Sequence, residues 1–190
     1  MDEEELRRLL GESVRQFQSR PPYSAFDIAT LNSISDSDIE FAIFEYAASA
    51  LDRTEGQLYQ SFLSLPEGIQ ALYSTWLVDA EVANGGFNQY FWNTPSELVT
   101  EAIAGFTFFG ATQRAELMRE AIAIARAEET EQLKFKQANT LEAFSESYAH
   151  TMLAPLDSRY YDISEDLSAL RIRAIRDQPL QFVTPSGPTQ

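Results

Sequence analysis

Apolar residues recur at the three- and four-residue spacing of one helix face along almost the whole chain, and this periodicity constrains the fold most strongly. The clearest stripe carries Ile69, Leu72, Tyr73, Trp76 and Leu77. With 190 residues and a hydrophobic content of 44%, the chain can bury about 70% of its unfolded surface. We therefore predict an all-α fold, a single compact multi-helix domain of about seven to nine helices.

Proline, glycine and apolar spacing divide the chain into three parts. Residues 1–22 are predicted to form an N-terminal helix and a linker that ends at a Pro-Pro pair. Residues 23–178 are predicted to form the helical domain. Residues 179–190 are punctuated by Pro and Gly, and we predict that they form a flexible tail.

Local start and stop signals predict boundaries inside the helical domain. The sequence SLPE at 64–67 has the spacing of a capping box, and the glycines at 85–86 favour a helix end just before them. A further helix is expected over about 95–106. Residues 154–163 are interpreted as a short turn that precedes the last helix.

The charge of the chain is strongly one-sided. Its 14 Lys and Arg against 29 Asp and Glu give a net charge of −15. Between residues 21 and 113 there is one basic residue, Arg53, against twelve acidic ones, a net charge of −11. We call residues 21–113 the acidic stretch. It disfavours direct nucleic acid binding and favours basic partners, although acidity can also serve solubility alone.

Residues that carry common catalytic or metal chemistry are scarce. The chain has no Cys and a single histidine, His150, so neither a thiolate metal site nor a His-based cluster is expected. Glu146 and His150 lie four residues apart and are interpreted as a solvated pair. We predict no catalytic residue, no cofactor and no metal. The absence of a long apolar run predicts no membrane span. The sequence MDEEELRRLL is acidic before it is apolar, the reverse of a secretory signal, and together with the absence of Cys it favours a cytoplasmic location.

The sequence EVANGGFNQYFWN at 81–93 concentrates amide and aromatic side chains around two glycines. One interpretation is a structural corner, because glycine permits positive φ and Asn side chains can bond unpaired backbone groups. The other is a ligand pocket lined by Asn84, Gln89, Tyr90 and Trp92.

This motif closely resembles the hallmark of the DNA mimic protein nineteen-like family of bacterial domains. The matching positions are Glu81, Asn84, Gly85, Gly86, Phe87, Gln89, Tyr90, Phe91 and Asn93. Two further regions are similar to the family, namely AIAGFTFFGATQRAELMREAIAIA and the segment that carries Leu156, Asp157, Tyr160 and Tyr161. The resemblance covers about residues 45–180.

The resemblance implies an all-α acidic protein, expected to form a homodimer, that imitates the charge pattern of DNA. Such a protein would occupy the DNA-binding face of a basic DNA-binding protein, such as a transcription regulator, and would not bind nucleic acid itself. Its partner-binding carboxylates are predicted to be Asp36, Asp38, Glu40, Glu45, Asp52 and Glu55. The motif itself is then structural. The alternatives are a small-ligand-binding or enzymatic domain that uses the motif pocket, and an acidic interaction partner such as a toxin neutraliser.

Overall fold

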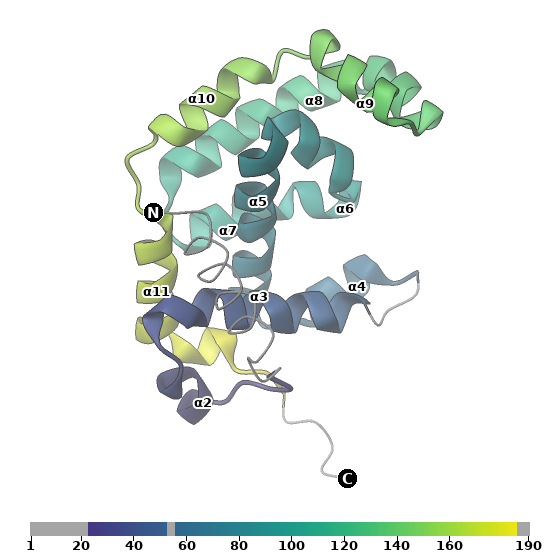
Figure 1. Cartoon of the computed structure of the whole chain (residues 1–190). Coiled ribbons are helices and arrows are strands. Elements are labelled where there is room, and N and C mark those ends of the chain that lie inside the picture. The colour runs from purple at the N-terminus through teal and green to yellow at the C-terminus, as the bar shows by residue number, and fades with distance from the viewer. Residues whose placement is uncertain (1–22, 53–55, 186–190) are drawn as a thin grey trace, which may run out of the picture.

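Helix α5 (Glu67–Asn93) runs through the middle of the molecule, and the other helices pack along its length (Figure 1). The structure, a computed structural model, describes residues 23–52 and 56–185. The periodicity of α5 explains its position, because its first turns bury Ile69 and Leu72 in one apolar cluster, while Val78 and Val82 farther along are buried in another. The helix therefore serves two parts of the core.

The other described elements are all helical. In chain order they are α2 (Ile28–Ser33), α3 (Asp36–Asp52), α4 (Leu58–Ser64), α6 (Ser96–Val99), α7 (Glu101–Phe108), α8 (Thr112–Ala138), α9 (Leu141–Ser147), the 3-10 helix η1 (Tyr148–His150), α10 (Ala154–Asp162), α11 (Leu167–Asp177) and the 3-10 helix η2 (Pro179–Phe182). The described ranges contain no strand, so the all-α prediction is confirmed there. Within the same ranges, no helix has the length and apolar character needed to cross a membrane.

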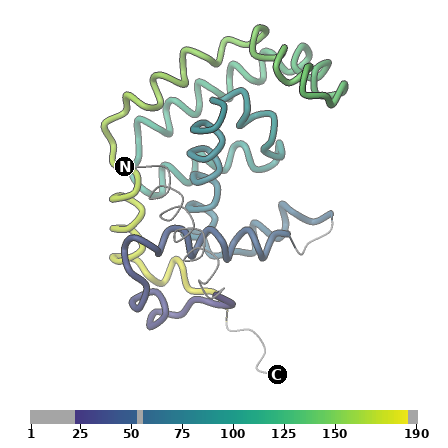
Figure 2. The backbone as a smooth tube through the Cα atoms, viewed as in Figure 1, coloured from purple at the N-terminus to yellow at the C-terminus, as the bar shows by residue number. Residues whose placement is uncertain are grey.

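Two apolar clusters are arranged one after the other along α5. The first joins α2, α3 and the start of α5 to α11 and η2. The second joins the end of α5 to α7, α8 and α10. Figure 2 shows α3 crossing the first half of α5, while α8 and α10 cross the other end. Leu170 of α11 packs against both clusters, so they form a continuous core.

Several predicted boundaries are wrong for local reasons. The capping box at 64–67 does not form, because Ser64 belongs to the end of α4 and its hydroxyl donates to the Ser61 carbonyl at 2.7 Å. The expected turn at 154–163 is instead helix α10. The helix expected over about 95–106 is divided at Thr100 into α6 and α7.

The predicted flexible tail is wrong for residues 179–185. The Phe182 ring is fully buried in the first cluster, where it packs against Gly68 and Phe108. The Phe26 amide donates to the Thr184 hydroxyl at 2.8 Å, and the Thr184 amide donates to the Phe26 carbonyl at 2.9 Å. Burial of the Phe182 ring therefore holds residues 179–185 against the core despite their proximity to Pro and Gly residues. Residues 186–190 and the predicted N-terminal helix at 1–22 lie outside the described residues.

Candidate functional site

The family motif forms a corner inside α5. Gly86 adopts φ 74° and ψ −175°, which breaks the helix before it resumes at Phe87. Asp157 of α10 occupies this break, and its carboxylate accepts a hydrogen bond from the Phe87 amide at 2.8 Å. Burial raises the pKa of Asp157, and the hydrogen bond from Phe87 opposes that effect. The hydrogen bond between the Phe87 amide and the Asp157 carboxylate therefore attaches α10 to the motif.

Two tyrosines fix the backbone on the N-terminal side of the corner. The Tyr148 hydroxyl donates to the Gly85 carbonyl at 2.8 Å, and the Tyr161 hydroxyl donates to the Val82 carbonyl at 3.1 Å. These bonds satisfy carbonyls that the interrupted helix leaves without their usual partners. Sequences 63 and 79 residues away therefore complete the corner.

Glu81 joins the two arms of the corner. Its Oε2 accepts hydrogen bonds from Gln89 Nε2 and Asn93 Nδ2, each at 2.8 Å. On the core side, Phe87 and Tyr90 are fully buried, and burial raises the pKa of the Tyr90 phenol. These contacts support the structural interpretation of the motif, with Glu81 as its clip.

Removing the Glu81 clip is expected to lower the free energy of unfolding by about 1–3 kcal/mol, because two amides lose a charged acceptor. The variant is Glu81→Ala, and urea denaturation followed by circular dichroism measures the change. Glu116→Ala is the control, since Glu116 is exposed on α8 and should change stability by less than about 0.5 kcal/mol. If Glu81→Ala and Glu116→Ala had the same free energy of unfolding, the hydrogen bonds of Glu81 to Gln89 and Asn93 would not stabilise the domain.

A buried ion network lies between α3, α5 and α11. The Arg171 side chain is only 4% exposed, and its Nη1 contacts Glu40 Oε2 at 3.2 Å and Asp79 Oδ2 at 2.9 Å. Its Nε donates to the Thr75 hydroxyl at 3.2 Å. The Tyr160 hydroxyl donates to Asp79, and burial followed by the Asp79 charge raises the pKa of Tyr160. This network holds helices together at the junction of the two core clusters.

The network changes the interpretation of two predicted partner-binding carboxylates. The Glu40 side chain is 12% exposed and engages Arg171, so it faces the interior. Asp36 is exposed, but Arg176 Nη2 lies 2.7 Å from its Oδ1. The same Nη2 and Nη1 donate to the Ile34 and Leu31 carbonyls at the end of α2, each at 2.6 Å. Both acids therefore balance arginines of α11.

The other predicted carboxylates are placed differently. Asp38, Glu45 and Asp52 are seven residues apart along α3, a spacing that brings them to one face of the helix at intervals of about 10.5 Å. Asp38 and Glu45 are half-buried, whereas Asp52 is exposed. We call these three residues the α3 stripe. Glu55 lies outside the described residues.

Glu101 of α7 and Asp52 of α3 lie near tyrosines of α4 and α5. The Tyr59 hydroxyl donates to Glu101 Oε1 at 2.9 Å, and Asp52 raises the pKa of Tyr73 in addition to the larger effect of burial. The Tyr59 ring stacks on Phe62, which also contacts Tyr73. The fold therefore brings acids of α3 and α7 to the neighbourhood of α4.

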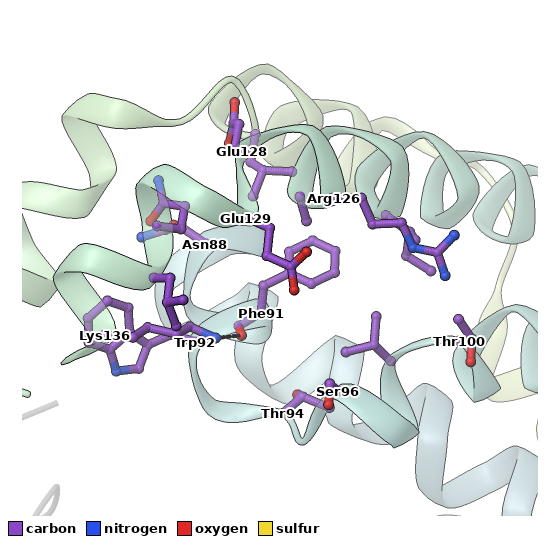
Figure 3. A pocket seen from close by; sticks show the side chains of 16 residues that line it. Asn88, Phe91, Trp92, Thr94, Ser96, Thr100, Arg126, Glu128, Glu129 and Lys136 are labelled. Atoms are coloured by element: carbon purple, nitrogen blue, oxygen red, sulfur yellow. Dashed lines mark hydrogen bonds between the residues drawn. The ribbon is translucent and has the colours of Figure 1, made fainter.

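A cavity of about 530 Å³ lies beside the motif, between the end of α5, α6 and α8 (Figure 3). Of the four residues proposed from sequence to line a pocket, Trp92 lines this one. Asn84 is exposed elsewhere, while Gln89 and Tyr90 are buried in the corner. Among the described residues, no three His, Asp or Glu side chains are grouped to hold a metal ion.

Sequence reasoning did not anticipate the roles of Arg171, Tyr148 and Arg126. Arg171 and Tyr148 act on residues more than sixty positions away, so no local pattern identifies their partners. Arg126 lines the cavity from α8, in a segment that reads as an ordinary amphipathic helix.

Comparison with known proteins identifies one family. The family model described as DMP19-like protein matches residues 63–178, which is more than half of the chain. The matched region begins at the end of α4 and includes the corner, the cavity and the arginines of α11. No curated protein matches the chain. No solved structure matches it either.

Proposed function

We propose, from the premise that this chain belongs to the DMP19-like protein family, that it is an acidic protein-binding module that sequesters a basic DNA-binding protein. A transcription regulator is the partner class that the resemblance suggests. The proposal includes a cytoplasmic location and a homodimer, and it contains no catalytic step. The observation that carries it is the acidic stretch, with one basic against twelve acidic residues between positions 21 and 113.

The physical basis is the replacement of phosphates by carboxylates. A DNA-binding protein presents Lys and Arg to the phosphates of a duplex, whose charges on one strand rise by about 3.4 Å each along the helix axis. The α3 stripe presents carboxylates at intervals of about 10.5 Å along its own axis, which is close to the axial rise of three base pairs. Because Asp36 and Glu40 pair with arginines of α11, we assign partner binding to the α3 stripe, whose Asp38 accepts a hydrogen bond from the Ser35 hydroxyl at 2.7 Å, rather than to all six acids.

Neutralising the α3 stripe should weaken partner binding without unfolding the domain. In the triple variant Asp38→Asn, Glu45→Gln, Asp52→Asn, we expect partner affinity to fall at least about tenfold, equal to about 1.4 kcal/mol. The readout is affinity capture from the native cell extract at low salt, with elution by DNA and separately by salt. The captured protein is then titrated against the original chain and against the triple variant.

A matched variant separates local recognition from net charge. Glu116→Gln, Glu142→Gln, Glu146→Gln also removes three negative charges, all from exposed acids outside the acidic stretch, and its binding should stay near that of the original chain. Binding that is unchanged between low and high salt, or that DNA does not displace, would reject the proposal. Equal losses in both triple variants would reject the α3 stripe as the surface.

The cavity beside the motif favours a second candidate function, the binding of a small ligand. Its volume of about 530 Å³ lies within the range of known ligand sites. This function uses α8 and the end of α5 rather than α3, so the two candidates can be tested by separate variants.

A further inference from the structure

The cavity of Figure 3 has mostly apolar walls. Phe91, Val99, Ile122 and Leu153 come from α5, α6, α8 and the start of α10, and they surround a space large enough for a small organic molecule. Trp92 packs edge-on against Phe144 of α9 at 5.0 Å between ring centroids, which fixes that end of the wall. The shape therefore favours an apolar ligand body.

Most polar groups around the cavity are already engaged in holding its walls. Lys136 Nζ donates to the Phe91 carbonyl at 2.6 Å, and Gln132 Nε2 donates to the His150 carbonyl at 2.9 Å. Glu128 accepts from the Thr151 hydroxyl and the Met152 amide, each at 2.7 Å. Burial lowers the pKa of Lys136, and the nearby Glu129 opposes that effect. These contacts hold the cavity in shape before any ligand binds.

Arg126 and Glu129, both exposed on α8, are the charged residues of the lining that have no hydrogen bond or ion pair within the described residues. Arg126 lies at the opposite end of the cavity from Lys136 (Figure 3). The four charged residues of the lining, Arg126, Glu128, Glu129 and Lys136, sum to zero. In a chain with a net charge of −15, a cavity whose charged lining residues sum to zero repels an anion less than the acidic stretch does.

We propose that this cavity binds a small organic anion with an apolar body, of the alkyl or aromatic carboxylate class, and that Arg126 holds its charged end. A guanidinium pairs with carboxylate geometry through two parallel N–H donors, while the apolar walls remove the body of the ligand from water. Thr100 stands on the wall near Arg126 in Figure 3 and supplies a hydroxyl at the same end.

Two dyes of similar size test the charge and the shape separately. The anionic dye 1-anilinonaphthalene-8-sulfonate and the uncharged N-phenyl-1-naphthylamine are titrated against the full chain by fluorescence, and decanoate is then added as a competitor. We expect one site per chain for the anionic dye and its displacement by decanoate. Arg126→Gln should weaken the anionic dye at least about tenfold and leave the uncharged dye nearly unchanged.

Controls on the same helix keep the result interpretable. Arg119→Gln, an exposed arginine two turns before Arg126, should bind both dyes normally. Ala125→Trp fills the cavity and should abolish both signals, whereas Ala127→Trp on the exposed side should not. Absence of dye binding, an equal loss of both dyes in Arg126→Gln, or binding that survives Ala125→Trp would overturn the proposal. Circular dichroism of each variant shows whether the helical fold is retained.

Discussion

Replacing Arg171 with methionine is expected to lower the free energy of unfolding by about 3–5 kcal/mol, which corresponds to a fall in Tm of about 6–20 °C for a chain of this size. The reason is electrostatic. Methionine fills a similar volume, but Glu40 and Asp79 then face each other without the cation that lies 3.2 Å and 2.9 Å from their oxygens. Thermal denaturation by calorimetry measures the effect.

Two companion variants test this explanation. Arg173→Met removes an exposed arginine from the same helix and should change stability by less than about 0.5 kcal/mol. Adding Glu40→Gln and Asp79→Asn to Arg171→Met removes the uncompensated charges and should restore much of the lost stability. An Arg171→Met chain as stable as the Arg173→Met chain would show that the network contributes nothing. A triple variant less stable than Arg171→Met would point to shape rather than charge.

The helices were largely predictable, because helix periodicity is set by residues three and four positions apart in the sequence. The apolar stripe from Ile69 to Leu77 follows directly from helix periodicity, and these residues do face the core. The two glycines at 85–86 also predicted a break, and Gly86 adopts the positive φ that permits it. What local patterns could not show is that the chain resumes as a helix beyond the break and continues to Asn93.

The charged surface was less predictable, because whether a carboxylate is paired depends on arginines that lie far away in the sequence. Glu40 and Asp36 read from sequence as exposed acids of α3, yet their arginines come from α11, more than 130 residues later. Asp157 similarly reaches Phe87 across 70 residues. Periodicity places a residue on a face of its helix, but only the packing of whole helices decides which arginine that face meets.

Gly86→Ala is the second substitution expected to have a large effect, with a loss of about 3 kcal/mol or more. Gly86 has φ 74° and ψ −175°, a region that is essentially restricted to glycine and costs other residues about 1–3 kcal/mol. A Cβ at this position would also stand 2.4 Å from Asp157 Oδ2. Asp157 can move only by giving up its hydrogen bond to the Phe87 amide, which costs about 1.5–3 kcal/mol more.

Gly110 provides a control that separates these two causes. It also has φ 74°, but no atom lies within 4 Å of the position that a Cβ would occupy. Gly110→Ala should therefore show the backbone effect alone, about 1 kcal/mol, or a fall in Tm of about 2–4 °C. If Gly86→Ala destabilises the chain no more than Gly110→Ala, the contact with Asp157 has no energetic consequence.

A double-mutant cycle then measures the contact itself. Asp157→Ala removes both the obstacle to a Cβ at Gly86 and the acceptor of the Phe87 amide. Because the two substitutions destroy the same interaction, their combined cost should be smaller than the sum of their separate costs by more than about 0.5 kcal/mol. Costs that simply add would mean that Gly86 and Asp157 contribute to stability independently. Non-additive costs would show that the glycines of the family motif have two roles. They bend α5, and the absence of a side chain at Gly86 leaves room for Asp157 of α10.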